Sequence, residues 1–450
     1  MPSPSHVVAI VGGATAGAEA AGILADHGVM SVVFDQNPRP YGKIEDGLPR
    51  WHVKLRQKEY NEIDARLGRA GVHFVPRTKI GRDIAFPSLV RDWGFTAVML
   101  AHGAWHDRPF PVEGADRFIG RGFVYQNPFI YWFNHFTERD YAGPQYDVAD
   151  GAVVVGGGLA SIDVLKALQI ETVRQALAAR GIEQDMLQLE HKGIPAVLAG
   201  HGLSWETLGL RGATLYYRRR VEDMPLADAP PGADQARQQV VETVRRKILD
   251  KAMQKYAFQV RPLMVPVGLI VEDDRLAGLR FQRTRVERGR AEPIPGETED
   301  VRAPLVVSSI GSIPEPLAGI EQDGQLFRWT DERLGRLPGY ETVFSVGNVV
   351  TGKGNIADSR RHSIEVTGHL VERFLGLADG HPAYEAPPDP ARQAAAEAAE
   401  EVAEWVRSQP ALGAAHVEAI LARVRQRQQA VGYSGVYADW IARVRPADLG

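Results

Sequence analysis

The 450-residue chain contains no cysteine. This absence excludes disulfides, cysteine-ligated iron–sulfur clusters, thiol nucleophiles and redox-active dithiols from the chain. Any electrons that pass through the protein must therefore travel on a bound organic cofactor. The absence also fits a reducing compartment, so we expect a cytoplasmic protein.

Long apolar runs and a strong charge bias are absent as well. No run of about 18 apolar residues occurs, so the sequence predicts no membrane span. Residues 1–6 lack the charged and apolar regions of a signal peptide. The 52 basic and 56 acidic residues leave a net charge of −4, which gives no sign of a nucleic-acid partner. With 44% hydrophobic residues, the composition predicts a globular chain of about three domains.

A first β-α-β unit opens the chain. An apolar strand at residues 7–11 leads into residues 12–17, which read Gly-Gly-Ala-Thr-Ala-Gly and begin a small-residue helix. This is a dinucleotide-binding fingerprint, except that Ala14 replaces the middle glycine. The next strand ends at Asp35. A carboxylate at this position accepts hydrogen bonds from ribose hydroxyls and repels a 2′-phosphate, so it favours FAD or NAD over NADP. The alternative is a turn that only packs the helix on the strand. The expected cofactor contacts are Gly12, Ala14, Ala16, Gly17, Asp35 and Gln36.

A second β-α-β unit begins near residue 152. Its valine-rich strand leads into residues 156–161, Gly-Gly-Gly-Leu-Ala-Ser, and a mostly helical insertion at 170–209 precedes the paired strand 214–217. Three arginines, residues 218–220, follow that strand, and no acid stands there. Arginines can grip a 2′-phosphate, so this unit favours NADP(H), although a solvated run of charge is the alternative. The expected contacts are Gly156, Gly158, Leu159, Ala160, Arg218 and Arg219.

A late strand at residues 340–350 ends in a Gly-Asn pair. The amide of Asn348 can hydrogen-bond to a ribityl chain, and residues 351–356 can direct backbone N–H groups at a flavin ring, which would stabilise negative charge on the reduced ring. A plain loop is the alternative. The expected contacts here are Gly347, Asn348, Gly354, Asn355 and Ile356.

The order of these motifs resembles the adrenodoxin-reductase-type ferredoxin–NADP reductases and the related NADPH-oxidising small subunit of glutamate synthase. The resemblance covers roughly residues 6–375. Besides the two turns, it rests on these segments: 38–43, 47–49, 101–104, 217–220 followed by Met224-Pro225, 309–311 and 346–348. It implies that FAD and NADPH are the cofactors, that a ferredoxin-like protein accepts the electrons, and that further cofactor contacts are made by Gly42, Lys43, Leu48, His102, Gly103 and Gly311.

The chain departs from that group at several of these positions. Tyr41 and Lys43 stand where Gly and Leu are frequent, His102 stands in place of Thr, and Asn348 in place of Asp. These departures concern the redox tuning of a flavin more than its binding. The iron–sulfur domain of the glutamate synthase branch has no counterpart in a chain without cysteine.

His52 is the candidate catalytic side chain, because the resemblance implies a histidine near the flavin after residues 47–49. It would relay a proton or shift the flavin potential, and a packing role is the alternative. We expect Trp51 to fill a core and His102 and His106 to hold no metal. A basic helix start at residues 54–58 is a solvated face or a docking point for an acidic ferredoxin.

The sequence thus predicts an α/β protein with two Rossmann-like domains. The FAD domain comprises residues 1–110 and 335–385, the inserted NADPH domain residues 111–334, and a helical extension residues 386–450. The predicted function is NADPH oxidation through FAD to a one-electron carrier. Two alternatives are a two-electron reductase of a small molecule or quinone, and a nucleotide-binding subunit of a larger electron-transfer complex.

Overall fold

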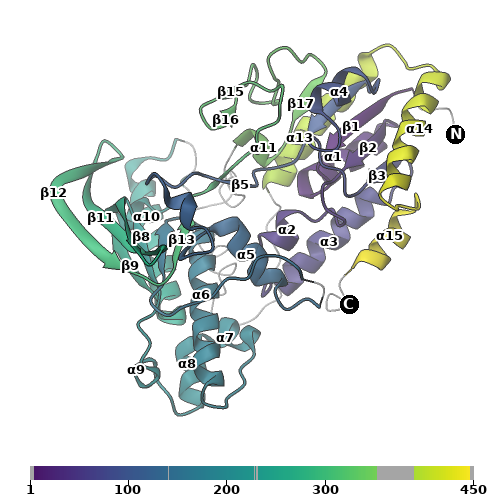
Figure 1. The fold of residues 1–450 in the computed structure, drawn as a ribbon. Helices are drawn as coiled ribbons and strands as arrows, with labels where there is room; N and C mark the ends of the chain where they lie inside the picture. The colour runs from purple at the N-terminus through teal and green to yellow at the C-terminus, as the bar shows by residue number, and fades with distance from the viewer. Residues whose placement is uncertain (1–4, 140, 228, 230–231, 352–389, 446–450) are drawn as a thin grey trace.

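Two parallel five-stranded sheets organise the molecule (Figure 1). The computed structural model describes residues 5–139, 141–227, 229, 232–351 and 390–445. The first sheet has the order β17-β4-β1-β2-β3, with strands Val343–Ser345, Ala97–Leu100, Val7–Val11, Met30–Phe34 and Val72–Val75. The second has the order β6-β13-β7-β8-β9, with strands Phe123–Tyr125, Val306–Ser309, Val153–Gly156, Thr214–Tyr217 and Gln259–Pro262. The predicted fold class is confirmed.

Both sheets consist of buried apolar strands with helices packed on them, as parallel sheets require. The first domain carries α1 Thr15–Asp26, α2 Lys43–Asp46, α3 Val53–Leu67, α4 Phe86–Arg91 and α11 Asn348–Thr351. The second carries α5 Gln126–His135, α6 Leu159–Ala178, α7 Met186–Lys192, α8 Ile194–Gly200, α9 Trp205–Leu208 and α10 Gln235–Tyr256. Two 3₁₀ turns are Ala115–Phe118 and Val221–Asp223. None of the described helices is both long and apolar enough to cross a membrane.

The two crossings between the domains lie side by side. Strand β5, His106–Asp107, pairs antiparallel with β14, Ser312–Ile313. Because β17 pairs with β4, the first sheet contains strands that precede the second domain in the chain and one that follows it. A small hairpin, β15 Gln322–Asp323 and β16 Leu326–Phe327, lies on the return path.

An antiparallel meander extends from the second domain, at the left of Figure 1. Its strands are β10 Met264–Glu272, β11 Arg275–Glu287 and β12 Arg290–Arg302. Strand β12 lies outside the strands that the sequence predicts, because Pro293, Pro295 and Gly296 are typical of a loop. Its exposed acids face arginines of the neighbouring strand, for example Asp300 with Arg280.

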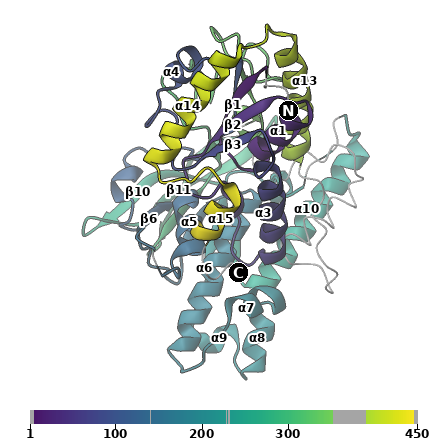
Figure 2. The same cartoon turned by 90° about the vertical axis from the view of Figure 1, so that its right-hand side faces the viewer.

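The C-terminal helices belong to the core of the first domain. They are α13 Pro390–Ser408, α14 Ala414–Ala430 and α15 Tyr437–Val444, and Figure 2 shows α13 beside α1 and α14 near β3. Val402 and Val406 are buried in the same apolar cluster as α1. The indole N–H of Trp440 donates to the carbonyl of Pro38 at 2.7 Å.

Candidate dinucleotide-binding sites

The first glycine turn needs glycine at two positions. Gly12 has φ of 102°, and a Cβ there would lie 2.6 Å from the carbonyl oxygen of Ala101. A Cβ on Gly17 would lie 1.8 Å from the carbonyl oxygen of Gly12, so this glycine packs the helix on the strand, as the fingerprint requires. The turn is therefore a rigid platform at the carboxyl edge of the sheet.

The departure at Ala14 has a local explanation. Gly42 has φ of 50°, and a Cβ there would lie 2.8 Å from the methyl group of Ala14. The loop that follows Asp35 can thus pass over the turn because Gly42 leaves room for that methyl group. Gly42 and Ala14 are therefore complementary in size, and this turn can carry alanine at its middle position.

Both fingerprint helices begin without a side-chain cap. Ala14 is the N-cap of α1 and Gly158 the N-cap of α6, and neither helix end has a capping side-chain hydrogen bond. The first N–H groups of each helix and its positive dipole end are therefore available to an anion. Both helix starts fit a pyrophosphate group.

Asp35 lies at the end of β2, beneath the first turn. Its two carboxylate oxygens accept from the backbone N–H groups of Gly13 and Asn37, both at 2.8 Å. Burial raises its pKa to about 6, against the effect of these two donors. Each oxygen can accept a further hydrogen bond, so the carboxylate suits a ribose with free hydroxyl groups.

A cleft opens around this turn. The predicted residues that line it are Gly12, Ala14, Asp35, Gln36, Gly42 and His102. Residues that the sequence did not single out also line it: Asn37, Thr78, Lys79, Trp105, Glu315 and Leu317. Lys79 pairs with Glu315 at 2.7 Å and so links the end of β3 to the return crossing. The only sequence signal that could have indicated Thr78 and Lys79 as cleft residues is their position directly after a strand of the same sheet.

His102 has an unsatisfied imidazole in this cleft. Both ring nitrogens are buried without a hydrogen-bond partner, and burial lowers the pKa to about 4. The ring is therefore neutral and offers one donor and one acceptor. Leaving such a group unpaired costs about 1–3 kcal/mol, which a polar ligand in the cleft would recover. This is the clearest sign that the cleft fits a polar cofactor.

The late strand meets the first turn. A Cβ on Gly347 would lie 2.8 Å from the methyl group of Ala16, and the N–H of Val346 donates to the carbonyl of Leu100. Asn348 begins α11 at this edge. Gly103 has a positive φ beside the cleft residue His102. The predicted contacts Gly354, Asn355 and Ile356 lie outside the described residues.

Lys43 and Leu48 lie at the junction with the second domain. The Lys43 ammonium donates to Asn127 Oδ1 at 3.3 Å and to Ser312 Oγ at 3.1 Å. Burial lowers its pKa to about 8. Neither residue is among those that line the cleft, so their role as cofactor contacts stays a prediction.

The second glycine turn is equally crowded. A Cβ on Gly156 would lie 2.2 Å from Ser161 Oγ, and one on Gly157 would lie 2.3 Å from the ring of Tyr217. Gly158 faces open space, with no atom nearer than 4.0 Å. Ser161 takes the third glycine position and donates to the carbonyl of Ser309 at 3.1 Å. The turn therefore leaves its one open approach at Gly158, next to Leu159 and Ala160 at the helix start. Gly311, after β13, also faces open space.

The three arginines after β8 have different surroundings. Arg220 forms two hydrogen bonds with the carboxylate of Asp223, at 3.0 and 2.9 Å. Arg219 donates to Tyr217 Oη at 3.1 Å and to the carbonyl of Asp223. Arg218 is exposed, and within the described residues its guanidinium has no hydrogen bond or ion pair. Among the described residues, Arg218 thus has no partner, Arg219 is oriented by Tyr217, and Arg220 is occupied by Asp223.

His52 and Trp51 lie against the second domain. Trp51 packs in its core beside Phe133, with the Lys166 ammonium 4.5 Å from the ring centre, so the prediction of a core residue is confirmed. His52 is the N-cap residue of α3, although its side chain makes no capping hydrogen bond. Burial lowers its pKa to about 3, and Lys166 adds to the effect. Its imidazole is therefore neutral near pH 7.

One part of the predicted basic face is wrong. Arg56 is only 6% exposed and donates to Tyr60 Oη at 3.0 Å and to the carbonyl of Glu45 at 3.0 Å. Its guanidinium is buried and bound to these internal partners, so it cannot attract a partner protein at the surface. Only Lys54 and Lys58 of this segment are exposed.

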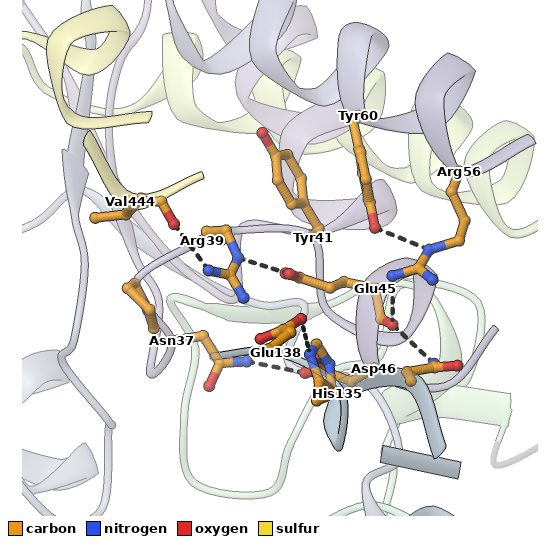
Figure 3. Close-up of polar contacts among 12 residues, drawn as sticks. Asn37, Arg39, Tyr41, Glu45, Asp46, Arg56, Tyr60, His135, Glu138 and Val444 are labelled. Atoms are coloured by element: carbon orange, nitrogen blue, oxygen red, sulfur yellow. Dashed lines mark hydrogen bonds and ion pairs between the residues drawn. The ribbon is translucent and has the colours of Figure 1, made fainter. Parts of the chain in front are cut away.

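A buried polar network joins the two domains through α2 and α5 (Figure 3). Glu45 and Asp46 of α2 face Arg39 on one side and His135 of α5 on the other. Burial raises the pKa of Glu45 to about 7, although Arg39 opposes the shift. No local pattern indicates this network, because His135 lies 89 residues from Asp46 along the chain.

The chain is similar in sequence to known proteins. The chain is 29% identical over 324 residues to the NADPH-Fe(3+) oxidoreductase subunit beta of Geobacter sulfurreducens, which covers 70% of this chain and 38% of that protein. It is 25% identical over 350 residues to the mitochondrial NADPH:adrenodoxin oxidoreductase of Arabidopsis thaliana, covering 71% and 70%. The chain thus spans about two-fifths of the bacterial relative's length. No family model matches it.

A solved structure supports the fold. FprA of Mycobacterium tuberculosis in complex with NADPH superposes with a TM-score of 0.58 at 20% identity, covering 98% of this chain and 99% of FprA. At this identity the likeness shows the fold alone. Together with the sequence relatives, it confirms the resemblance to adrenodoxin-reductase-type proteins.

Proposed function

We propose that the chain binds FAD and NADPH and oxidises NADPH, passing electrons through the flavin to a one-electron carrier such as ferredoxin. The observation that carries the proposal is the contrast between two similar turns. Each precedes an uncapped helix, but one has Asp35 at the neighbouring strand end and the other has Arg218. An acid suits a free ribose, and a free arginine suits a 2′-phosphate.

The residues divide between the two cofactors accordingly. The FAD contacts are Gly12, Ala14, Ala16, Gly17, Asp35, Gln36, Gly42, Lys43, Leu48, His102, Gly103, Gly311, Gly347, Asn348, Gly354, Asn355 and Ile356. The NADPH contacts are Gly156, Gly158, Leu159, Ala160, Arg218 and Arg219. The same division supports one domain at residues 1–110 with 335–385 and another at 111–334. The helical extension proposed at 386–450 packs on the first of these.

A bound flavin would accept a hydride from NADPH and release the electrons singly. The chain itself supplies binding, orientation and protection from water. The first turn and His102 hold one dinucleotide, and the second turn with Arg218 holds the other. His52, neutral in its buried position, can carry a proton on one ring nitrogen without adding a charge.

A role as one subunit of a larger electron-transfer complex is the second candidate. The Geobacter relative is named as a beta subunit, and the chain spans 38% of its length. In that case the same two sites would serve a partner chain instead of a diffusing carrier. Co-purification of a stoichiometric partner from the native host would favour this reading.

The experiment is anaerobic titration of the purified protein. FAD, not FMN, should be released on denaturation, and NADPH should bleach the flavin at lower concentration than NADH. Arg218→Ala should raise the apparent dissociation constant for NADPH roughly tenfold and leave NADH unaffected. Arg220→Ala is the control, because Asp223 already binds that guanidinium. Preference for NADH in the wild type would overturn the assignment.

Reoxidation identifies the acceptor. Stopped-flow mixing of the reduced protein with ferredoxin, a quinone and ferric citrate separates a one-electron route from a two-electron route.

His52→Ala should leave FAD content unchanged and alter the reduction rate or the midpoint potential. Unchanged values would assign His52 to packing.

A further inference from the structure

Helix α5 belongs to the second domain but ends inside the first. It packs on α6 and β13 of its own domain and on α2 of the other. Its last two residues, Asn134 and His135, are 5% and 3% exposed. Two polar side chains buried this deeply at a domain boundary need partners, and each has them in the segment that leads to His52.

Asn134 binds the backbone of that segment at three points. Its Nδ2 donates to the carbonyls of Glu45 at 2.9 Å and Leu48 at 3.0 Å, and its Oδ1 accepts from the N–H of Arg50 at 2.9 Å. One amide thereby satisfies backbone groups that the short helix α2 leaves open. The path of residues 45–50 is fixed from the other domain.

His135 adds a charged link (Figure 3). Its Nε2 lies 3.0 Å from Asp46 Oδ1, and its Nδ1 lies 2.6 Å from Glu138 Oε1. Burial alone lowers its pKa, but hydrogen bonds to the two carboxylates outweigh burial and raise it to about 9. Below that pH the ring is an imidazolium that donates from both nitrogens.

The other groups around His135 keep this link in place. The ring of Tyr131 lies 4.6 Å from the imidazole between centres, on the same helix. From the first domain, Asn37 donates to Asp46 and Arg39 pairs with Glu45. Arg39 and Arg50 also act on Glu138, and Glu45 adds negative charge nearby. The imidazolium therefore joins one acid of each domain, Asp46 and Glu138, while Arg39 neutralises Glu45 beside it.

We propose that Asn134 and His135 are positioning residues, which hold residues 45–50 and hence His52 in register with the second domain. The inference rests on the proposed function, because register between the domains sets how the nicotinamide meets the flavin. Binding of each cofactor depends on its own glycine turn and should not need this clamp. Hydride transfer should need it, since misplacement of about 1 Å can cost on the order of a hundredfold in rate.

The first test separates rate from binding. The variants are Asn134→Ala and His135→Gln, with the exposed His201→Gln as the matched control. Each variant is expected to keep FAD content and NADP⁺ affinity within about twofold and to lose about tenfold or more in the stopped-flow reduction rate at saturating NADPH. Adding Asp46→Asn to His135→Gln removes the opposing charge and should recover part of the rate. Equal rates in all variants would overturn the proposal.

The second test follows the pH dependence of the reduction rate in the wild type and in His135→Gln. A histidine with a raised pKa stabilises the clamp below its unfolded value near 6.5, and that contribution is lost as pH rises through about 9. The reduction rate of the wild type, divided by that of His135→Gln, should therefore fall above pH 9. A flat ratio would contradict the clamp.

The third test reads the register without any cofactor. Because the chain has no cysteine, spin labels at Glu404→Cys in the first domain and Lys192→Cys in the second are the only labels. Pulsed electron resonance should give a narrow distance distribution that broadens in the Asn134→Ala/His135→Gln background and not with His201→Gln. An unchanged width would refute the clamp even if the cofactor assignment holds. Broadening without NADPH oxidation would refute the proposed function alone.

Discussion

At the scale of single residues, Asp35 has two tasks that oppose each other. It ties the first turn to the loop above it through the N–H groups of Gly13 and Asn37, yet it is also the residue that we propose to bind a ribose. Burial penalises its charge and raises the pKa to about 6. Hydroxyl donors from a ribose favour the ionised carboxylate, so FAD binding and loss of this proton are linked.

FAD affinity should therefore depend on pH through this carboxyl group. Binding lowers the pKa of Asp35 from about 6, so affinity should rise with pH up to about 6 and level off above it. The dissociation constant of FAD, measured by flavin fluorescence between pH 5 and 8, gives the profile. Asp35→Asn removes the titrating group and should flatten it. A variant with the same slope as the wild type would show that another group is responsible.

At the scale of elements, the C-terminal helices are structural parts of the first domain. Trp440 is 2% exposed and joins the cluster of α1 and α3 while its indole N–H reaches the loop at Pro38. That loop leads to Gly42 and α2. The tail thus supports the segment that passes over the first turn.

Trp440→Ala should lower the free energy of unfolding by about 3–5 kcal/mol, the usual cost of deleting a buried tryptophan. Trp405→Ala is the matched control, because Trp405 is only partly buried at the edge of the same cluster and should cost clearly less. Urea denaturation followed by circular dichroism gives both values. Equal losses would mean that the tail is docked loosely.

The elements that could be predicted are those with local signals. Strand β1, its glycine turn and the acid after β2 follow from periodicity and spacing. Strand β12 could not be predicted, because Pro293 and Gly296 contradict it locally and only pairing with β11 explains it. The roles of Arg56 and His135 could not be predicted either, because they depend on partners that lie elsewhere in the chain and meet them only in the fold.

At the scale of the whole molecule, Lys43 joins the first domain to α5 of the second domain and to the return crossing. Its ammonium donates to Asn127 on α5 and to Ser312 on β14, the return strand. Burial lowers its pKa to about 8, so the folded protein bears the cost of a buried cation at neutral pH. That cost is relieved as pH rises.

Lys43→Met should therefore change how stability depends on pH. Between about pH 8 and 10.5 the folded lysine loses its proton while the unfolded lysine keeps it, so the wild type gains stability with pH. Relative to Lys43→Met, its melting temperature should rise across that window and be constant below it. Thermal melts of both proteins at matched pH give the difference. A constant difference would place Lys43 in solvent.

The pairing of β17 with β4, together with the buried tail, sets the order in which the chain can fold during synthesis. The second sheet is complete once β13 ends at Ser309, and it can close around its own core while the ribosome is still adding residues. The first domain has all its early strands by residue 100, but it lacks an edge strand until residue 345 and its outer helices until residue 444. The N-terminal domain is therefore the last to mature, and its apolar α1 surface stays uncovered until α13 has been synthesised and packs on it.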